Sequence, residues 1–270
     1  MGDAETQSSG SGSTPISVCI IAGNEEDSIG ACLDSVSPIA DEIVVVLDSR
    51  STDRTSEICT GHGARVVRHD WLGHVRQKDY CVGLAKNDWV FCIDADERVS
   101  PELAACVNRL RNEGFSAAAY SVRRRNFYLG RWMRYGGWYP DRKVRLFDRR
   151  RARWGGINPH DHVIVDADAR CDRLDFDLLH YTYRDLTHHT RVINSYATIA
   201  AQEKADRGST RLVTFRLFTH PAAKFIKTYL LQGDFLAGTR GFIHAVQASY
   251  LVFLKYAKLW EKRDRHDRNE

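Results

Sequence analysis

The chain has 270 residues, of which 43% are hydrophobic and 10% aromatic, and its formal net charge is +4. This apolar content can bury a substantial core, so disorder of most of the chain is excluded, and the length allows one large domain with or without an appendage. Residues 1–14 are the exception, because they are polar and rich in Ser and Gly. Lacking a basic start and an apolar segment, they are expected to form a flexible tail and not a signal peptide.

The seven cysteines form an odd set without a CxxC pair, and most of them lie inside apolar runs. This pattern favours reduced, buried thiols in a cytosolic protein. We therefore expect neither zinc nor disulfides.

The first hundred residues alternate short apolar runs with segments of helical period. Strands are predicted at Ile16–Ala22, Glu42–Asp48 and Ala64–Arg68, and a fourth begins at Trp89. The alternation of strand and helix predicts parallel βαβ units with right-handed crossovers.

Three helices are predicted between these strands. Asn24 is the expected N-cap of the first, with the acids Glu25–Asp27 in its first turn. The turn Ser49–Thr52 opens the second, and the third lies around Val75–Ala85.

Polar residues follow three of the predicted strands, namely Asn24, Asp48 and Asp94. Ligands of such sheets bind beyond the carboxyl ends of the strands, so we expect these side chains to meet in one crevice. Asp94 and Asp96 are two residues apart and could converge on one Mg²⁺ or Mn²⁺ that holds a diphosphate. An acidic loop after a strand is also a common solvated turn or helix cap, and the pattern alone leaves both readings open.

The character of the chain changes after Asp96. Ser100-Pro101-Glu102 is a typical helix start, and a strand is predicted at Ala117–Val122. Basic and aromatic residues then alternate from Arg123 to Arg153, in what we expect to be irregular or antiparallel structure. Such a stripe could bind single-stranded nucleic acid, a phosphorylated sugar or a lipid head group, or be a solvated basic face.

From Leu186 onward the sequence reads as helical. Between Arg240 and Lys255 no residue carries a formal charge, but this span is too short to cross a membrane. The segment predicts an amphipathic helix whose polar side carries His244, Gln247, Lys255, Lys258 and Lys262. Such a helix could lie on an anionic membrane surface or close the core, and both alternatives stay open.

Several motifs stand together in a fixed order, and as a set they resemble the family 2 glycosyltransferases, inverting nucleotide-sugar-dependent enzymes of the GT-A fold. In the second half the chain is similar to the branch that contains lipopolysaccharide core β-glucosyltransferases. The resemblance covers about residues 15–260. It rests on Ser17-Val-Cys-Ile-Ile21, Asn24-Glu25-Glu26, Asp41-Glu42-Ile-Val-Val-Val46, Asp48-Ser-Arg-Ser-Thr-Asp53, Asp88-Trp89-Val90, Asp94-Ala-Asp-Glu-Arg98, Gly136-Gly-Trp-Tyr-Pro-Asp-Arg-Lys-Val-Arg-Leu-Phe147, Gly155-Gly156, Pro159-His160-Asp161, Leu178-Leu-His-Tyr-Thr-Tyr183 and Phe253-Leu-Lys-Tyr256.

The resemblance implies an α/β, Rossmann-like, mostly parallel sheet with helices on both faces and a C-terminal helical extension. It implies a catalytic domain at 15–185 and a helical region at 186–270 that could associate with a membrane. It further implies binding roles for a set of polar residues. Asn24, Glu25, Asp48 and Asp53 would line the nucleoside pocket, Asp96 would be the principal ligand of Mg²⁺ or Mn²⁺, Asp94 would contact ribose or metal, and His180 would add a metal or diphosphate contact.

Asp53 and His180 also have structural readings, as a dipole-favoured acid in the first turn of a helix and as a satisfied core histidine. For the base that takes the acceptor proton, the resemblance favours Asp161, with His160 in reserve. Candidate cations for the departing diphosphate are Arg142, Lys143 and Arg145.

The chain departs from the family pattern at two places. Asp161 stands where Glu is common, and Gln77-Lys78-Asp79 stands where a Gln-Arg-Asn-like run is usual; no role is assigned to Asp79.

The leading hypothesis is a metal-dependent inverting hexosyltransferase at the cytoplasmic face of the inner membrane. Its expected partners are a nucleotide sugar, such as UDP-glucose, and a saccharide or lipid-linked, anionic acceptor such as the lipopolysaccharide inner core. The rivals are a nucleic-acid-binding protein that uses the stripe from Arg123 to Arg153, which is the less favoured reading, and a catalytically silent membrane-bound scaffold of the same fold. The chain has neither GxGxxG after a strand nor GxxxxGK[ST], so dinucleotide oxidoreductases and P-loop NTPases have no support.

Overall fold

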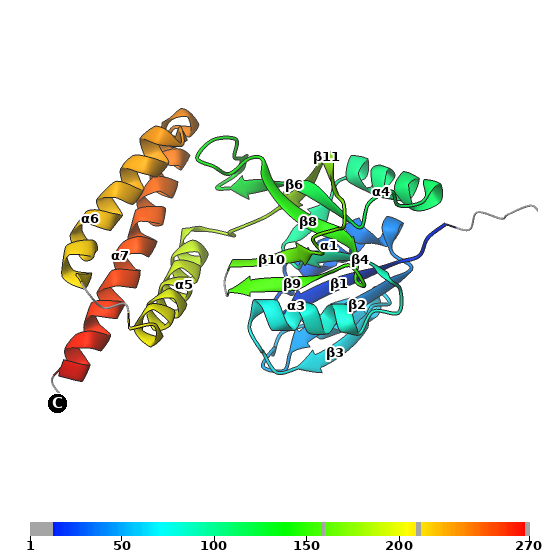
Figure 1. The fold of residues 1–270 in the computed structure, drawn as a ribbon, viewed down its shortest axis with the longest axis horizontal. Coiled ribbons are helices and arrows are strands. Elements are labelled where there is room, and N and C mark those ends of the chain that lie inside the picture. The colour runs from blue at the N-terminus through cyan, green and yellow to red at the C-terminus, as the bar shows by residue number, and fades with distance from the viewer. Residues whose placement is uncertain (1–12, 158–159, 209–211, 268–270) are drawn as a thin grey trace, which may run out of the picture. The chain divides into compact units, whose positions relative to one another are not determined.

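A computed structural model describes residues 13–157, 160–208 and 212–267 (Figure 1). The expected tail, 1–14, therefore lies outside the described residues except for Ser13 and Thr14. The chain divides into two compact units. The first consists of Met1–Val122, Lys143–Gly156 and Asp161–Leu178, and the second of Arg123–Arg142, Ile157–His160 and Leu179–Glu270.

The first unit is built on four parallel strands in the order β3-β2-β1-β4. They are β1 (Ile16–Ala22), β2 (Glu42–Asp48), β3 (Arg65–His69) and β4 (Trp89–Asp94). The first two coincide with the predicted strands, and the third begins one residue later than expected. The connecting helices are α1 (Ile29–Val36), followed by the 3₁₀ turn η1 (Ser37–Ile39), then α2 (Thr55–Gly61) and α3 (His74–Gly83). The predicted βαβ arrangement is confirmed.

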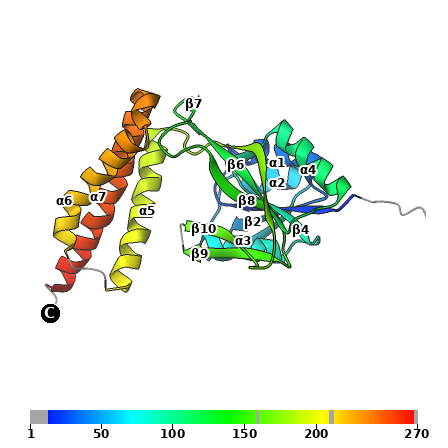
Figure 2. The same cartoon turned by 45° about the horizontal axis from the view of Figure 1, so that its top comes forward.

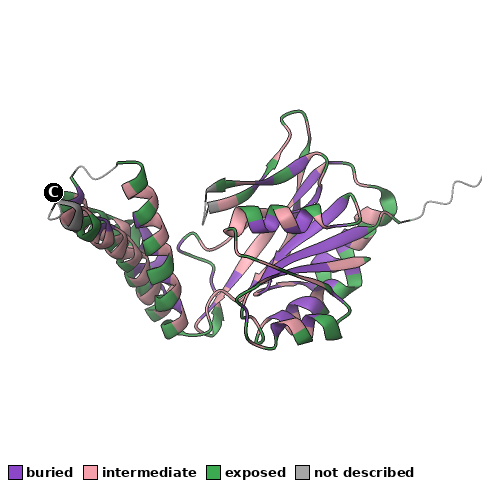
Figure 3. Ribbon diagram, turned by 90° about the horizontal axis from the view of Figure 1, so that it is seen from below, coloured by how far each residue is buried: buried purple, intermediate pink, exposed green. Residues whose placement is uncertain are grey.

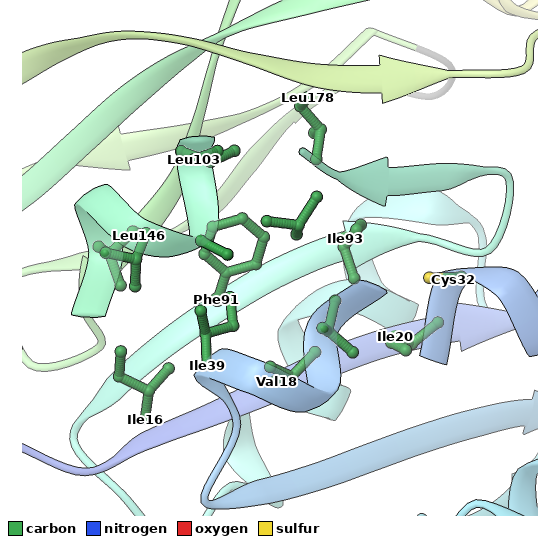
Figure 4. Packing of buried hydrophobic residues seen from close by; sticks show 14 of the residues in the cluster. Ile16, Val18, Ile20, Cys32, Ile39, Phe91, Ile93, Leu103, Leu146 and Leu178 are labelled. Atoms are coloured by element: carbon green, nitrogen blue, oxygen red, sulfur yellow. The ribbon is translucent and has the colours of Figure 1, made fainter. Parts of the chain in front are cut away.

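Both faces of the central strand β1 are buried, because its alternate side chains enter two different hydrophobic clusters. Ile16, Val18 and Ile20 pack in the cluster that contains α1 and α4 (Pro101–Glu113), whereas Cys19 and Ile21 pack in the cluster that contains α3. Figure 4 shows the first of these clusters, with Phe91 and Ile93 of β4 facing Leu103 of α4. The expected helices on both faces of the sheet are thus confirmed.

Beyond β4 the sheet becomes antiparallel. Strand β8 (Asp141–Asp148) pairs with β4, and the order continues through β6 (Ala119–Tyr128), β11 (Cys171–His180) and β5 (Glu97–Val99). The short β7 (Arg131–Trp132) pairs with β6, while β9 (Ala152–Ile157) and β10 (His160–Val165) form a separate two-stranded sheet. Antiparallel structure in the basic, aromatic stretch is therefore confirmed.

Two local predictions are wrong. Helix α1 begins at Ile29 with Ser28 as its N-cap residue, and it has no acid in its first turn. Asn24 is not the cap, because its side chain is bound to the loop after β2, and Glu25–Asp27 lie before the helix. The strand expected at Ala117–Val122 is the longer β6, which starts at Ala119 and runs to Tyr128.

The second unit contains three long helices that lie side by side (Figure 2), namely α5 (Leu186–Asp206), α6 (Val213–Ile226) and α7 (Thr239–Asp267). The α6–α7 connection includes the π-helical turn η2 (Lys227–Leu231) and the 3₁₀ turn η3 (Asp234–Ala237). Their shared core is small and is built from Ala201, Val213, Tyr256 and Leu259.

The helical region begins where the sequence predicts. Helix α5 begins at Leu186, but the division into domains 15–185 and 186–270 stays a prediction.

Six of the seven cysteines are buried and Cys171 is exposed. None of the helices within the described residues is both long and apolar enough to span a membrane.

Candidate active site

The site lies at the carboxyl edge of the parallel strands. Strand β1 is flanked by β2 and β4, with Ala22 opposite Leu47 and Ile21 opposite Asp94. Because all three strands run in the same direction, Asn24, Asp48 and Asp94 are at one edge of the sheet, as the sequence predicts.

The loops that follow β1 and β2 are bound to each other by hydrogen bonds. Asn24 Oδ1 accepts from the backbone N–H of Thr52 at 2.9 Å and from Ser51 Oγ at 3.1 Å. The backbone N–H of Glu26 donates to Asp53 Oδ2 at 3.0 Å. These contacts hold two of the four predicted nucleoside residues in a fixed, polar loop pair.

The acids of these loops also make structural contacts. Asp53 Oδ1 accepts from the N–H of Thr55, the first residue of α2, at 3.0 Å, so its reading as an acid at a helix start has direct support. Glu25 Oε2 accepts from Ser28 Oγ at 2.7 Å. Asp48 is paired with Arg50, and that side-chain hydrogen bond holds the pKa of Asp48 below its usual value. Nucleoside binding by these residues stays a prediction.

Five charged side chains form one connected group around Asp94. We call this group the charged cluster; its members are Lys78, Asp94, Glu97, Arg145 and Asp161. Lys78 Nζ is 2.8 Å from Asp94 Oδ1 and 2.7 Å from Asp161 Oδ2. Arg145 Nη2 is 2.8 Å from Asp94 Oδ2 and 2.6 Å from Glu97 Oε1. Asp94 is therefore held from both sides, and one lysine joins it to the predicted base.

Three of these charged side chains are buried, so removing a partner would leave an uncompensated charge inside the protein. The side chains of Lys78, Arg145 and Glu97 are 9%, 3% and 0% exposed, so each charge needs its partner in the protein. Burial by itself would raise the pKa of Asp161, but the adjacent Lys78 ammonium outweighs it and lowers the pKa below its usual value. Asp161 is consequently ionised at neutral pH, which is the state that a general base requires.

Asp96 lies in the turn between β4 and β5, and its side chain is partly buried. Its carboxylate is the hard oxygen donor that Mg²⁺ and Mn²⁺ prefer. Both oxygens of Asp94 are engaged by the cationic side chains of Lys78 and Arg145. The role of Asp96 as the principal metal ligand stays a prediction.

No group of three or more His, Cys, Asp and Glu side chains in the described part of the chain is arranged to hold a metal ion. A cation held at Asp96 would therefore take most of its ligands from phosphate oxygens and water, as Mg²⁺ does in many phosphate sites.

The remaining predicted residues are distributed over both units. Lys143 belongs to the first unit, whereas Arg142 and His180 belong to the second. His180 is buried, with Nδ1 2.6 Å from Asn126 Oδ1, so its reading as a satisfied core histidine has support. His160 begins β10, but its side chain lies outside the described residues. The diphosphate and metal roles of Arg142 and His180 stay predictions.

Sequence reasoning missed two members of the charged cluster, Lys78 and Glu97. Lys78 lies on the buried side of α3, with Nζ 4.6 Å from the centre of the Trp154 ring. A lysine on the apolar side of a helix is unusual and could have indicated a buried carboxylate partner. Glu97 is the third acid of Asp94-Ala-Asp-Glu97, and its burial was not visible in the pattern.

The basic stretch does not present one open row of cations. Arg124 pairs with Asp141 at 2.6 Å, Arg150 with Asp148 at 2.6 Å, and Arg145 is buried in the charged cluster. Arginines already neutralised by neighbouring carboxylates bind phosphates less well. Part of the positive charge of this stretch is therefore already balanced within the protein.

Removing Glu97 tests the structural role of the cluster. Glu97→Gln leaves the buried guanidinium of Arg145 without one of its two carboxylates, and we expect a loss of about 3 kcal/mol in the free energy of unfolding. Urea denaturation measures this loss. Asp168→Asn, which removes a carboxylate from an exposed arginine pair, is the matched control and should leave the urea midpoint almost unchanged. Equal effects of the two substitutions would contradict the prediction.

A mostly parallel sheet with acids at its carboxyl edge, continued by antiparallel strands, is the architecture expected of the GT-A fold. The family model of Glycosyl transferase family 2 matches residues 17–173, more than half of the chain. The chain belongs to this family and is a glycosyltransferase, and inversion of the anomeric carbon is typical of the family.

Relatives support this assignment along nearly the whole chain. An uncharacterized glycosyltransferase of Rickettsia typhi is 31% identical over 91% of this chain and 87% of its own length. The lipopolysaccharide core biosynthesis glycosyltransferase LpsC of Rhizobium meliloti is 28% identical over 92% and 93%. The mannosyltransferase PcManGT of Pyrobaculum calidifontis, solved with GDP-Man and Mn²⁺, is 13% identical, with a TM-score of 0.53 over 92% of this chain and 88% of that one. This last likeness confirms the GT-A fold.

Proposed function

We propose that this glycosyltransferase is metal-dependent and inverting, and that it moves a hexose from a nucleotide sugar, with UDP-glucose as the expected donor, to a saccharide or lipid-linked acceptor. The observation that carries the proposal is the pair of contacts by which Lys78 Nζ joins the Asp161 carboxylate to Asp94 at the carboxyl edge of the sheet. A base fixed beside the expected donor site is what transfer to a hydroxyl requires.

Asp161 accepts the proton of the acceptor hydroxyl as the oxygen attacks the anomeric carbon from the face opposite the leaving group. The bond from the anomeric carbon to the diphosphate oxygen breaks, and the configuration inverts. Lys78 holds the carboxylate in place with an Nζ to Oδ2 distance of 2.7 Å and keeps its pKa low. His160 is the reserve candidate for the same proton.

The departing nucleoside diphosphate needs compensation for its negative charge. Asp96 would hold a Mg²⁺ or Mn²⁺ that, when bound, neutralises charge on the diphosphate as it leaves. Lys143, Arg142 and His180 are candidates for further contacts with that group. Arg145 is 3% exposed and engaged by Asp94 and Glu97, which favours a role in holding the Asp94 loop.

For the nucleoside we propose the loop pair after β1 and β2. The hydrogen bonds of Asn24 and Asp53 preform these loops, and a preformed site loses less conformational entropy on binding. Glu25 and Asp48 supply further polar groups at the same edge.

The proposed acceptor is supported by the name of one relative. LpsC is named as a lipopolysaccharide core biosynthesis enzyme and matches nearly the whole chain. We therefore propose an anionic, lipopolysaccharide-like acceptor and peripheral action at the cytoplasmic face of the inner membrane. Assays with defined core oligosaccharides distinguish this acceptor from other saccharides.

Thermal unfolding with nucleotide sugars tests the donor assignment. At a UDP-glucose concentration about 100 times its Kd, with Mn²⁺ present, ligand linkage contributes about 2.7 kcal/mol and should raise Tm by roughly 5 °C. EDTA should remove most of this shift, and GDP-mannose and ADP-glucose serve as comparison donors. The proposal fails if no nucleotide sugar raises Tm or is turned over in the presence of Mn²⁺ or Mg²⁺.

A further inference from the structure

Exposed apolar side chains are concentrated in one part of the second unit. Among the described residues, thirteen of the seventeen large hydrophobic side chains that are exposed lie between Leu212 and Trp260, in α6, α7 and their connection. Figure 3 shows exposed positions along these helices, in contrast to the buried strands of the sheet. Isolated exposed apolar residues need no explanation, but such a concentration marks an interaction surface.

These exposed side chains are densest in residues 226–242, which comprise the last residue of α6, the connection and the first turn of α7. We call this segment the hairpin tip. Leu231 is 79% exposed and Leu236 is 58% exposed. Within the same segment, the ring of Tyr229 contacts the rings of Phe235 and Phe242, with centroid distances of 6.4 and 5.8 Å. The tip is therefore an apolar surface whose aromatic rings pack against one another.

The long helix α7 extends this apolar surface. Phe242, Val246, Tyr250 and Phe253 recur every three or four residues and are all exposed, so they form one stripe along the helix. The polar face of α7, for which the sequence left a membrane surface and closure of the core open, contacts α5 through Lys258. Lys258 Nζ lies 2.7 Å from Asn194 Oδ1 of α5, so this lysine holds two helices together. The exposed face of α7 is the apolar one.

The charge of this region identifies the partner. Residues 213–260 contain six basic residues and one acid, so their formal charge is +5, against +4 for the whole chain. The single acid, Asp234, is fully buried. Lys224 lies just before the tip, Lys227 and Arg240 lie within it, and Arg240 Nε donates to the backbone carbonyl of Leu129 at 2.7 Å. An apolar tip rimmed by cations matches an anionic lipid bilayer, which accepts apolar side chains and attracts Lys and Arg.

We infer that the hairpin tip inserts into the interfacial region of an anionic bilayer and holds the enzyme at the membrane surface. A second copy of the chain fits this surface less well, because a two-fold contact would bring two regions of charge +5 together. The inference rests on the proposed membrane location but not on the donor or the chemistry, so vesicle binding and glycosyl transfer can fail independently.

Sedimentation of the full-length protein with vesicles tests the inference. We expect binding to phosphatidylcholine vesicles that contain phosphatidylglycerol, and at least about tenfold weaker binding to phosphatidylcholine alone. Leu231→Gln with Leu236→Gln should weaken binding to the anionic vesicles at least about tenfold. Leu72→Gln with Leu186→Gln removes two other exposed leucines and should change it less than about twofold.

A second measurement does not depend on loss of binding. Relative to the wild type, which already contains six tryptophans, Leu231→Trp should show an additional blue shift of the tryptophan emission when anionic vesicles are added, because the new side chain enters an apolar environment. Absence of vesicle binding, full binding by the Leu231/Leu236 double variant, or an unshifted emission would each overturn the inference. So would a dimer that the same double variant dissociates while wild-type protein ignores vesicles.

Discussion

The Asp161→Asn enzyme is expected to turn over at least about 10³-fold more slowly than the wild type, with donor binding retained. General-base catalysis contributes roughly 10²- to 10⁴-fold, and Asn has no carboxylate to take the acceptor proton. Steady-state rates with the donor identified by thermal unfolding measure the loss. The same titration of Tm with nucleotide sugar should give an unchanged Kd, which separates loss of chemistry from loss of folding.

The pH dependence gives a sharper test of the role of Lys78. The pKa of Asp161 is lowered in the folded protein, so its stabilising contribution is present above its unfolded pKa and is lost as pH falls through the folded pKa. In Lys78→Gln the ammonium is absent and burial dominates, so the pKa of Asp161 rises. The acid limb of kcat/KM should then move to higher pH, and activity should recover in alkaline buffer. A uniform loss at every pH would instead mean that Lys78 only supports the fold.

Asp96→Asn is expected to lower turnover at least about a hundredfold and to raise the Mn²⁺ concentration needed for half-maximal activity. The physical reason is that one neutral amide oxygen replaces the carboxylate proposed as the principal protein ligand, and charge compensation on a leaving diphosphate is worth several kcal/mol. Metal titrations of turnover and of UDP-dependent Tm shifts measure both effects.

Asp94→Asn is the matched comparison, because it removes the neighbouring carboxylate in the same turn. Asp94 is paired with Lys78 and Arg145, so its replacement should lower the free energy of unfolding, which urea denaturation measures. If Asp96→Asn kept full turnover and metal dependence, the metal assignment would have to be abandoned.

Much of the first unit could be predicted from the sequence because its signals are local. The runs at Ile16–Ala22 and Glu42–Asp48 are apolar except for Ser17 and the two end residues of the second run, and the strands have the predicted bounds. Parallel pairing then follows from the intervening helices, and it brings Asn24, Asp48 and Asp94 to one edge.

The errors arise where a side chain binds a distant segment. Asn24 has the residue type of an N-cap, yet its amide oxygen accepts from Thr52, 28 residues away. Lys78 and Asp161 are 83 residues apart, and no local pattern shows that they touch. The polar face of α7 was visible in the sequence, but its partner α5 was not, so the sequence left open whether this face lies on a membrane or closes the core.

The sharing of Lys78 between Asp94 and Asp161 has an evolutionary consequence. Substitutions at these three positions should be strongly epistatic, because removing either acid changes the electrostatic field that the lysine exerts on the other. A relative that acquires Glu at position 161 must fit an extra methylene against the same ammonium. Among relatives, residues 78, 94 and 161 should therefore change together and not one at a time.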